Sequence, residues 1–117
     1  MANDQKAEAK KLSRYNIRPR SFEIAKKLGV KITPSNRGFK KIDIYFPLPG
    51  RANAYKYKFS VGDKRYLDFH LWTTLEMRGK VPPGTAEKRR KAYRNRHAAD
   101  LKIKGTPGFY AYRLLWF

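Results

Sequence analysis

The strongest constraint on the fold is a run of alternating apolar and polar residues from Ala54 to Leu71. Its apolar positions are Tyr55, Tyr57, Phe59 and Val61 before Gly62-Asp63, and Leu67, Phe69 and Leu71 after it. A period of two residues is typical of a β-strand with one buried face, and a Gly-Asp pair is typical of a turn. The pattern therefore predicts a β-hairpin.

The length of the turn sets the register of this hairpin. A loop of Gly62-Asp63 alone would place Phe59 opposite Tyr66 and send Leu67 to the far face. A loop that also includes Lys64 pairs Phe59 with Leu67 and gives one apolar face, so we predict the longer loop. We expect the aromatic residues of the hairpin to pack in the core, with a base-stacking platform as the alternative.

Helices and one further strand are predicted around the hairpin. A short amphipathic helix is expected over 22–28, ended by Gly29, and a strand over 41–46 with Ile42, Ile44 and Phe46 on one face. Capping-box spacing of Thr73 and Glu76 predicts a helical turn over 74–78.

A longer helix is predicted over 86–99, capped by Thr85 after a Pro-Pro-Gly break. The segment 109–117 fits either a buried helix or a buried strand. The whole pattern predicts a small α+β domain over 19–117, with an antiparallel β-hairpin or sheet and two or three short helices. An extended basic N-terminal arm is expected over 1–18.

The net charge of +19, from 28 Lys and Arg against 9 Asp and Glu, points to an anionic partner. The predicted helix over 86–99 carries the densest positive charge, at Lys88, Arg89, Arg90, Lys91, Arg94 and Arg96. Guanidinium forks suit phosphate and carboxylate oxygens, so these six residues are candidates for binding a polyanion or an acidic protein. A merely solvated face is the alternative. Because Lys and Arg also occur throughout the chain, we expect contact without sequence readout.

Aromatic residues gather near the C-terminus, and two interpretations of them stay open. The candidates are Tyr93, Phe109, Tyr110, Trp116 and Phe117. They either complete the chain's own core or insert into a pocket of a partner, as aromatic anchors do at interfaces. Tyr93 and His97 share a helix face, on which a packing role for His97 is expected.

Signatures of catalysis are missing from the sequence. It contains two histidines, no cysteine and no phosphate-binding, dinucleotide-binding or zinc-protease motif. His70 and Asp68 are expected to form an exposed pair on a strand. We expect no enzymatic activity, no cofactor, no metal and no small-molecule substrate. No apolar run approaches the ~18 residues of a membrane span, so none is expected.

The C-terminal third also resembles a known family. The residues concerned are Arg90-Lys91-x-Tyr93-x-x-Arg96-His97, then Gly105-Thr106-Pro107-Gly108-Phe109-Tyr110, then Leu114-Leu115-Trp116. They resemble the C-terminal signature of short basic proteins encoded by nucleocytoplasmic large DNA viruses. This chain has Tyr110 where that family has Trp, and it has 72–84 in place of the family's Gly- and Asp-containing segment. The resemblance implies a small, virion-associated viral protein and implies no reaction.

The leading expectation is a structural virion component, a minor capsid protein of the cement type in a large double-stranded DNA virus. It would bind neighbouring capsid or virion proteins through basic and aromatic contacts, and it would lie in the host cytoplasm during assembly. The alternative is a nucleic-acid-binding protein that condenses the genome without sequence preference. A third interpretation is a ribosome-associated basic protein.

Overall fold

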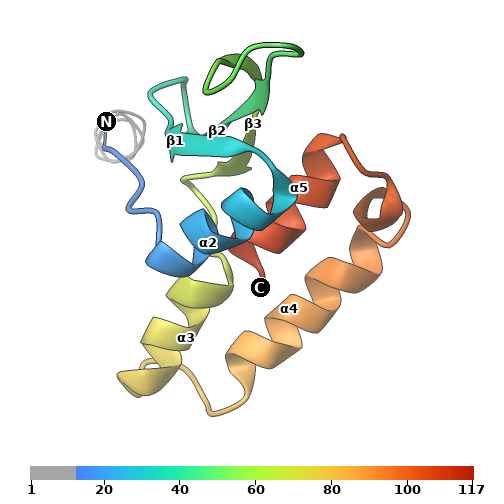
Figure 1. Ribbon diagram of the computed structural model, residues 1–117. Helices are drawn as coiled ribbons and strands as arrows, with labels where there is room; N and C mark the ends of the chain where they lie inside the picture. The colour runs from blue at the N-terminus through green and yellow to red at the C-terminus, as the bar shows by residue number, and fades with distance from the viewer. Residues whose placement is uncertain (1–12) are drawn as a thin grey trace. The chain divides into compact units, whose positions relative to one another are not determined.

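The computed structural model describes residues 13–117, and the chain divides into two compact units. The sheet unit ends at Arg65, and the helical unit comprises Tyr66–Phe117. Four α-helices and a three-stranded antiparallel sheet in the described residues confirm the predicted α+β class (Figure 1). The single domain over 19–117 stays a prediction. Of the predicted N-terminal arm, residues 1–12 lie outside the described residues.

Within residues 13–65, the sheet unit contains one helix and three strands. Its elements in chain order are α2 (Pro19–Leu28), β1 (Lys31–Pro34), β2 (Lys40–Pro47) and β3 (Tyr55–Asp63). Helix α2 has proline in its first turn and ends, as predicted, at Gly29. Gly29 has a φ of 75°, a left-handed conformation that glycine adopts without steric cost. The helix starts at Pro19, three residues earlier than predicted, because proline at the first helical position lacks only an N–H that would be unpaired there.

Strand β2 is the centre of the sheet, whose order is β1-β2-β3. Ile42 and Ile44 are fully buried, as predicted for the strand over 41–46, whereas Phe46 follows a register shift and is only partly buried. Ile44 lies opposite Ile32 of β1 and Phe59 of β3, so the three strands share an apolar face. Such cross-strand pairs are the main source of sheet stability.

The predicted hairpin over 54–71 is wrong in its second half. Strand β3 pairs with β2, and Phe69 and Leu71, expected in the partner of β3, belong to helix α3 (Phe69–Met77). Five alternating residues are too few to separate a strand from the start of a helix. Asp68 is the N-cap of α3, and its carboxylate accepts a hydrogen bond of 3.1 Å from the backbone N–H of Leu71.

Two smaller predictions at this helix are also corrected. Asp68 is 1% exposed and caps a helix, so it does not form an exposed strand pair with His70. The helical turn predicted over 74–78 overlaps the last part of α3, which ends at Met77, and Thr73 does not cap it. The hydroxyl of Thr73 instead donates to the carbonyl oxygen of Phe69, four residues earlier, at 2.8 Å.

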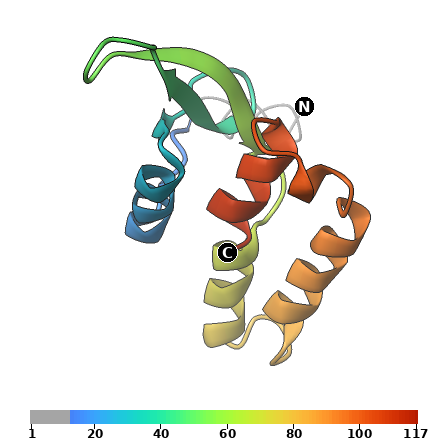
Figure 2. The same ribbon diagram turned by 45° about the vertical axis from the view of Figure 1, so that its right-hand side comes forward.

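The helical unit continues with α4 (Thr85–Arg96), a 3₁₀ turn η1 (Asp100–Lys102) and α5 (Pro107–Leu115). Helices α3 and α4 run side by side in opposite directions, in yellow and orange in Figure 2. Helix α4 ends three residues before the predicted 99, and its N-cap is Gly84 in place of Thr85. The hydroxyl of Thr85 donates to the carbonyl oxygen of Pro82 at 2.6 Å. The segment 109–117, for which a helix and a strand were both predicted as options, is helical as far as Leu115.

Candidate polyanion-binding surface

Helix α3 holds the start of α4 in place. One carboxylate oxygen of Glu76, on α3, accepts a hydrogen bond of 3.0 Å from the backbone N–H of Ala86, in the first turn of α4. The first N–H groups of a helix have no partner within the helix, so this contact does the work of a capping side chain. Ala86 is buried, which turns one face of α4 inwards.

Two of the six basic candidates face α3 and are engaged within the helical unit. The guanidinium carbon of Arg89 lies 4.6 Å from the ring centroid of Trp72, and that of Arg90 lies 4.3 Å from the ring centroid of Phe69. Arg90 also forms an ion pair with Glu87. Cation–π contacts of this kind contribute about 0.5–1 kcal/mol each at exposed sites. These two arginines therefore stabilise the packing of α3 on α4.

Lys88, Lys91 and Arg94 form what we call the outer basic row. They follow one another at intervals of three residues, so they form a continuous ridge on the surface of α4. All three are exposed, and the structure gives none of them an ion-pair partner within residues 13–117. Arg96, the sixth candidate, is also exposed but lies seven residues after Arg89, and therefore on the Arg89 side of α4 rather than in the row.

The acidic residues of the helical unit are occupied elsewhere. Asp68 and Glu76 hold helix N-termini, and Glu87 pairs with Arg90. Asp100 lies 3.7 Å from the Nδ1 atom of His97. The unit carries eleven Lys and Arg residues against these four carboxylates, a net charge of +7. The positive field along the outer basic row is therefore not cancelled within its own unit.

Tyr93 is the centre of an aromatic cluster that joins α4 to the C-terminal segment. Its ring stacks on Trp116, with centroids 4.6 Å apart and planes 17° apart, and its centroid lies 4.3 Å from that of His97. The ring of Tyr112 also stacks on that of Tyr93, with centroids 6.3 Å apart. Burial raises the pKa of Tyr93, although the charge of Arg96 opposes the shift. Ring contacts of this kind contribute about 0.5–1.5 kcal/mol beyond the area that they bury.

The other aromatic candidates also contact residues of their own unit. Phe109 and Tyr110 are buried and meet edge to face, with centroids 5.1 Å apart. Trp116 is 8% exposed, whereas Phe117 is 47% exposed and touches Tyr112 edge to face. Four of the five candidates, Phe117 being the exception, thus belong to the chain's own packing. Their structural placement matches the core alternative rather than the anchor alternative.

Arg113 fixes the end of η1 against α5, a role that the sequence analysis missed. Its guanidinium carbon lies 3.5 Å from the ring centroid of Phe109. One guanidinium nitrogen also donates to the carbonyl oxygens of Leu101 and Phe109, at 3.0 and 3.1 Å. The spacing of Phe109 and Arg113, four residues apart, would have indicated the ring contact once 109–117 was assigned to a helix.

No three His, Asp or Glu side chains within residues 13–117 are arranged to hold a metal ion. In the same part of the chain, no helix is both long and apolar enough to span a bilayer. Comparison with protein-family models, with curated proteins and with solved structures finds no match.

Proposed function

We propose that this protein binds nucleic acid without sequence preference, through the outer basic row of α4. The observation that carries the proposal is the uncompensated charge of Lys88, Lys91 and Arg94 on a helix whose other face is anchored. Phosphates of a nucleic-acid backbone carry the complementary charge, and their neutralisation releases condensed counterions. Contacts to phosphate position a protein on nucleic acid but carry no sequence information.

The anchored face of α4 makes the row a better binding surface than a mobile basic tail. The ring contacts of Arg89 and Arg90 and the hydrogen bond from Ala86 to Glu76 hold the helix on α3. The ordering of the backbone is thus completed during folding, and binding has to order only the three outward side chains.

The test is a variant that removes the row and spares the anchored face. We expect Lys88→Gln/Lys91→Gln/Arg94→Gln to weaken binding to random-sequence duplex DNA. The slope of log K against log salt should fall by about 2–3, because each lost phosphate contact changes it by about 0.9. Fluorescence anisotropy over a range of salt concentrations measures both quantities.

The matched control removes three exposed cations of the same unit that lie off the row, in Arg78→Gln/Lys80→Gln/Lys102→Gln. Net charge changes equally in the two variants, so a general loss of charge would lower both slopes alike. Equal slopes for the two variants would contradict the assignment of the row. Substitution of Arg89 and Arg90 is avoided because it would also remove their contacts with α3.

The second candidate is the structural virion component that the sequence resemblance implies. The spread of charge favours it, because the sheet unit carries +12 and the helical unit +7, so contacts with several acidic neighbours can be made at once. If virus particles contain the chain, a wash at about 1 M salt separates the candidates, since screening is then nearly complete. Release with the genome supports the nucleic-acid candidate, and retention on stripped shells supports the structural one.

A further inference from the structure

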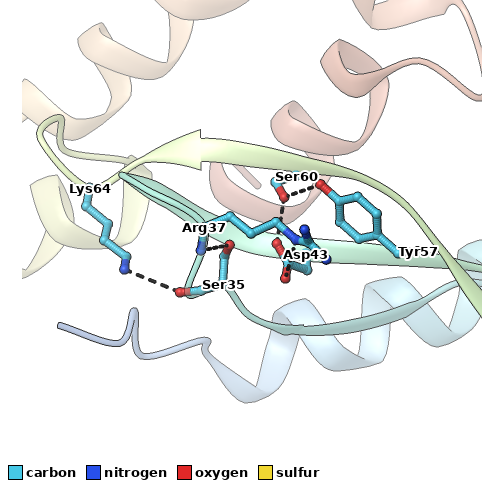
Figure 3. A network of polar contacts seen from close by, with 6 residues as sticks. All are labelled: Ser35, Arg37, Asp43, Tyr57, Ser60 and Lys64. Carbon is cyan, nitrogen blue, oxygen red and sulfur yellow. Dashed lines mark hydrogen bonds and ion pairs between the residues drawn. The ribbon is translucent and has the colours of Figure 1, made fainter. Parts of the chain in front are cut away.

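A closed ring of polar contacts lies on the sheet unit, away from α4 in the sequence. Figure 3 shows Arg37, from the loop between β1 and β2, reaching to Asp43 of β2, with its Nε atom 3.4 Å from a carboxylate oxygen. The other carboxylate oxygen accepts a hydrogen bond of 2.6 Å from the hydroxyl of Ser60. Because Ser60 has a single proton, the hydroxyl of Tyr57 must donate to it, at 2.8 Å. The guanidinium carbon of Arg37 lies 3.8 Å from the centroid of the Tyr57 ring.

The loop that carries Arg37 is itself fixed. The backbone N–H of Arg37 donates to the hydroxyl of Ser35 at 3.0 Å. From the end of β3, Lys64 donates through its ammonium group to the carbonyl oxygen of Ser35, at 3.3 Å, and through its backbone N–H to that of Phe39, at 2.7 Å. Ser35 is buried. These contacts thus fix the backbone of the loop from which Arg37 extends.

The ring borders a hollow of about 480 Å³ whose cationic lining residues are Arg37, Lys40 and Arg65. The acidic lining residue, Asp63, accepts two hydrogen bonds from the guanidinium of Arg65, at 3.0 and 2.7 Å. That contact lowers the pKa of Asp63, so its charge and that of Arg65 offset each other. Arg37 is half exposed, and its two terminal nitrogens have no acceptor among the described residues.

We propose that this hollow is a phosphate-binding pocket, in which the two terminal nitrogens of Arg37 and the ammonium of Lys40 contact the phosphate oxygens. The aromatic ring under Arg37 leaves the N–H groups in the guanidinium plane available, which is the geometry of bidentate phosphate recognition. Asp43 is buried and contacts Arg37 at its Nε atom. It therefore orients the guanidinium group and leaves the two terminal nitrogens available. The phosphate comes from either a free phosphate or a nucleic acid.

The pocket is tested with the full chain and inorganic phosphate, at an ionic strength kept constant with chloride. We expect saturable NMR shifts of the amide groups of residues 37–40. Lys40→Gln should weaken binding about tenfold, as for the loss of one hydrogen bond to a charged group. The matched control is Lys56→Gln, an equal change on an exposed residue of β3 that does not line the hollow. Shifts that do not saturate, or equal affinities of the two variants, would overturn the proposal.

Arg37→Lys provides a second variant that keeps the charge. Because lysine has no planar fork, we expect binding to weaken about tenfold here as well, with circular dichroism confirming that the fold is retained. An unchanged affinity would show that the fork is not used. The outer-row variant Lys88→Gln/Lys91→Gln/Arg94→Gln should bind phosphate normally at residues 37–40, so failure of this proposal and failure of the proposed function are distinguishable.

Two oligonucleotides of the same sequence separate the sources of the phosphate. If the shifts at 37–40 need a 5′-phosphate, the pocket binds a terminal phosphate group. If the 5′-hydroxyl oligonucleotide produces the same shifts, the pocket binds the phosphodiester backbone. Absence of shifts with inorganic phosphate and with both oligonucleotides would overturn the proposal.

Discussion

Lys88 and Arg89 are neighbours in the sequence, but their side chains have different tasks on α4. Lys88 is exposed and belongs to the outer basic row, whereas the guanidinium of Arg89 covers the ring of Trp72. The 100° turn between successive helical residues is sufficient to separate the two. A count of charges along the sequence therefore overstates the number of cations that α4 offers to a partner.

At the same scale, Gly108 is required by a close approach rather than by its backbone conformation. A Cβ atom at this position would lie 2.6 Å from the Cβ of Asp100, in η1. We expect Gly108→Ala to lower the free energy of unfolding by about 1–3 kcal/mol, the usual cost of overpacking. The direction of this change in the free energy of unfolding is informative, because a glycine-to-alanine substitution within a helix otherwise stabilises the protein by up to about 1 kcal/mol. Urea unfolding followed by circular dichroism measures the change.

The double variant Gly108→Ala/Asp100→Gly is the control for this prediction. Removal of the Asp100 Cβ removes the clash. Gly108→Ala should therefore cost less stability in the Asp100→Gly protein than it costs in the wild-type protein. Additive effects of the two substitutions would show that the contact is not the cause.

At the scale of elements, α4 depends on α3 for its first turn. We expect Glu76→Ala to lower the free energy of unfolding by about 1 kcal/mol, within the range for the loss of a helix cap, because the N–H of Ala86 loses its acceptor. The measurement is the urea midpoint at constant m-value.

Glu87→Ala is the matched control for this prediction. It removes the same charge from an exposed ion pair with Arg90, and such pairs contribute at most about 1 kcal/mol and often much less. A loss of stability for Glu87→Ala as large as that for Glu76→Ala would contradict the capping role of Glu76.

At the scale of the whole molecule, the net charge of +19 opposes folding through self-repulsion. We expect the melting temperature to rise by several degrees between about 0.05 M and about 0.5 M sodium chloride, because screening weakens this repulsion. The outer-row variant Lys88→Gln/Lys91→Gln/Arg94→Gln should show a smaller rise, since it carries three fewer charges. A melting temperature that falls with salt would mean that attractive ion pairs outweigh the repulsion.

Local patterns in the sequence by themselves determined α2, β2, β3 and the position of α4. The apolar residues of a buried face are only a few positions apart in the sequence, as Ile42 and Ile44 are in β2. The ends of α2 likewise depend on two local residues, Pro19 and Gly29. The basic segment was also predictable as the most charged part of the chain, because charge is a property of composition. These features need no knowledge of which segments meet.

Only the tertiary structure decided the features that depend on contacts between distant residues. The partner of β3 is β2 rather than the segment after Gly62, because the pairing of strands is settled by the apolar face that they bury together. Packing on α3 selected Arg89 and Arg90 for ring contacts and left Lys88, Lys91 and Arg94 outside. Trp116 lies against Tyr93 for the same reason, since the burial of an aromatic ring depends on the surface that folding brings to it.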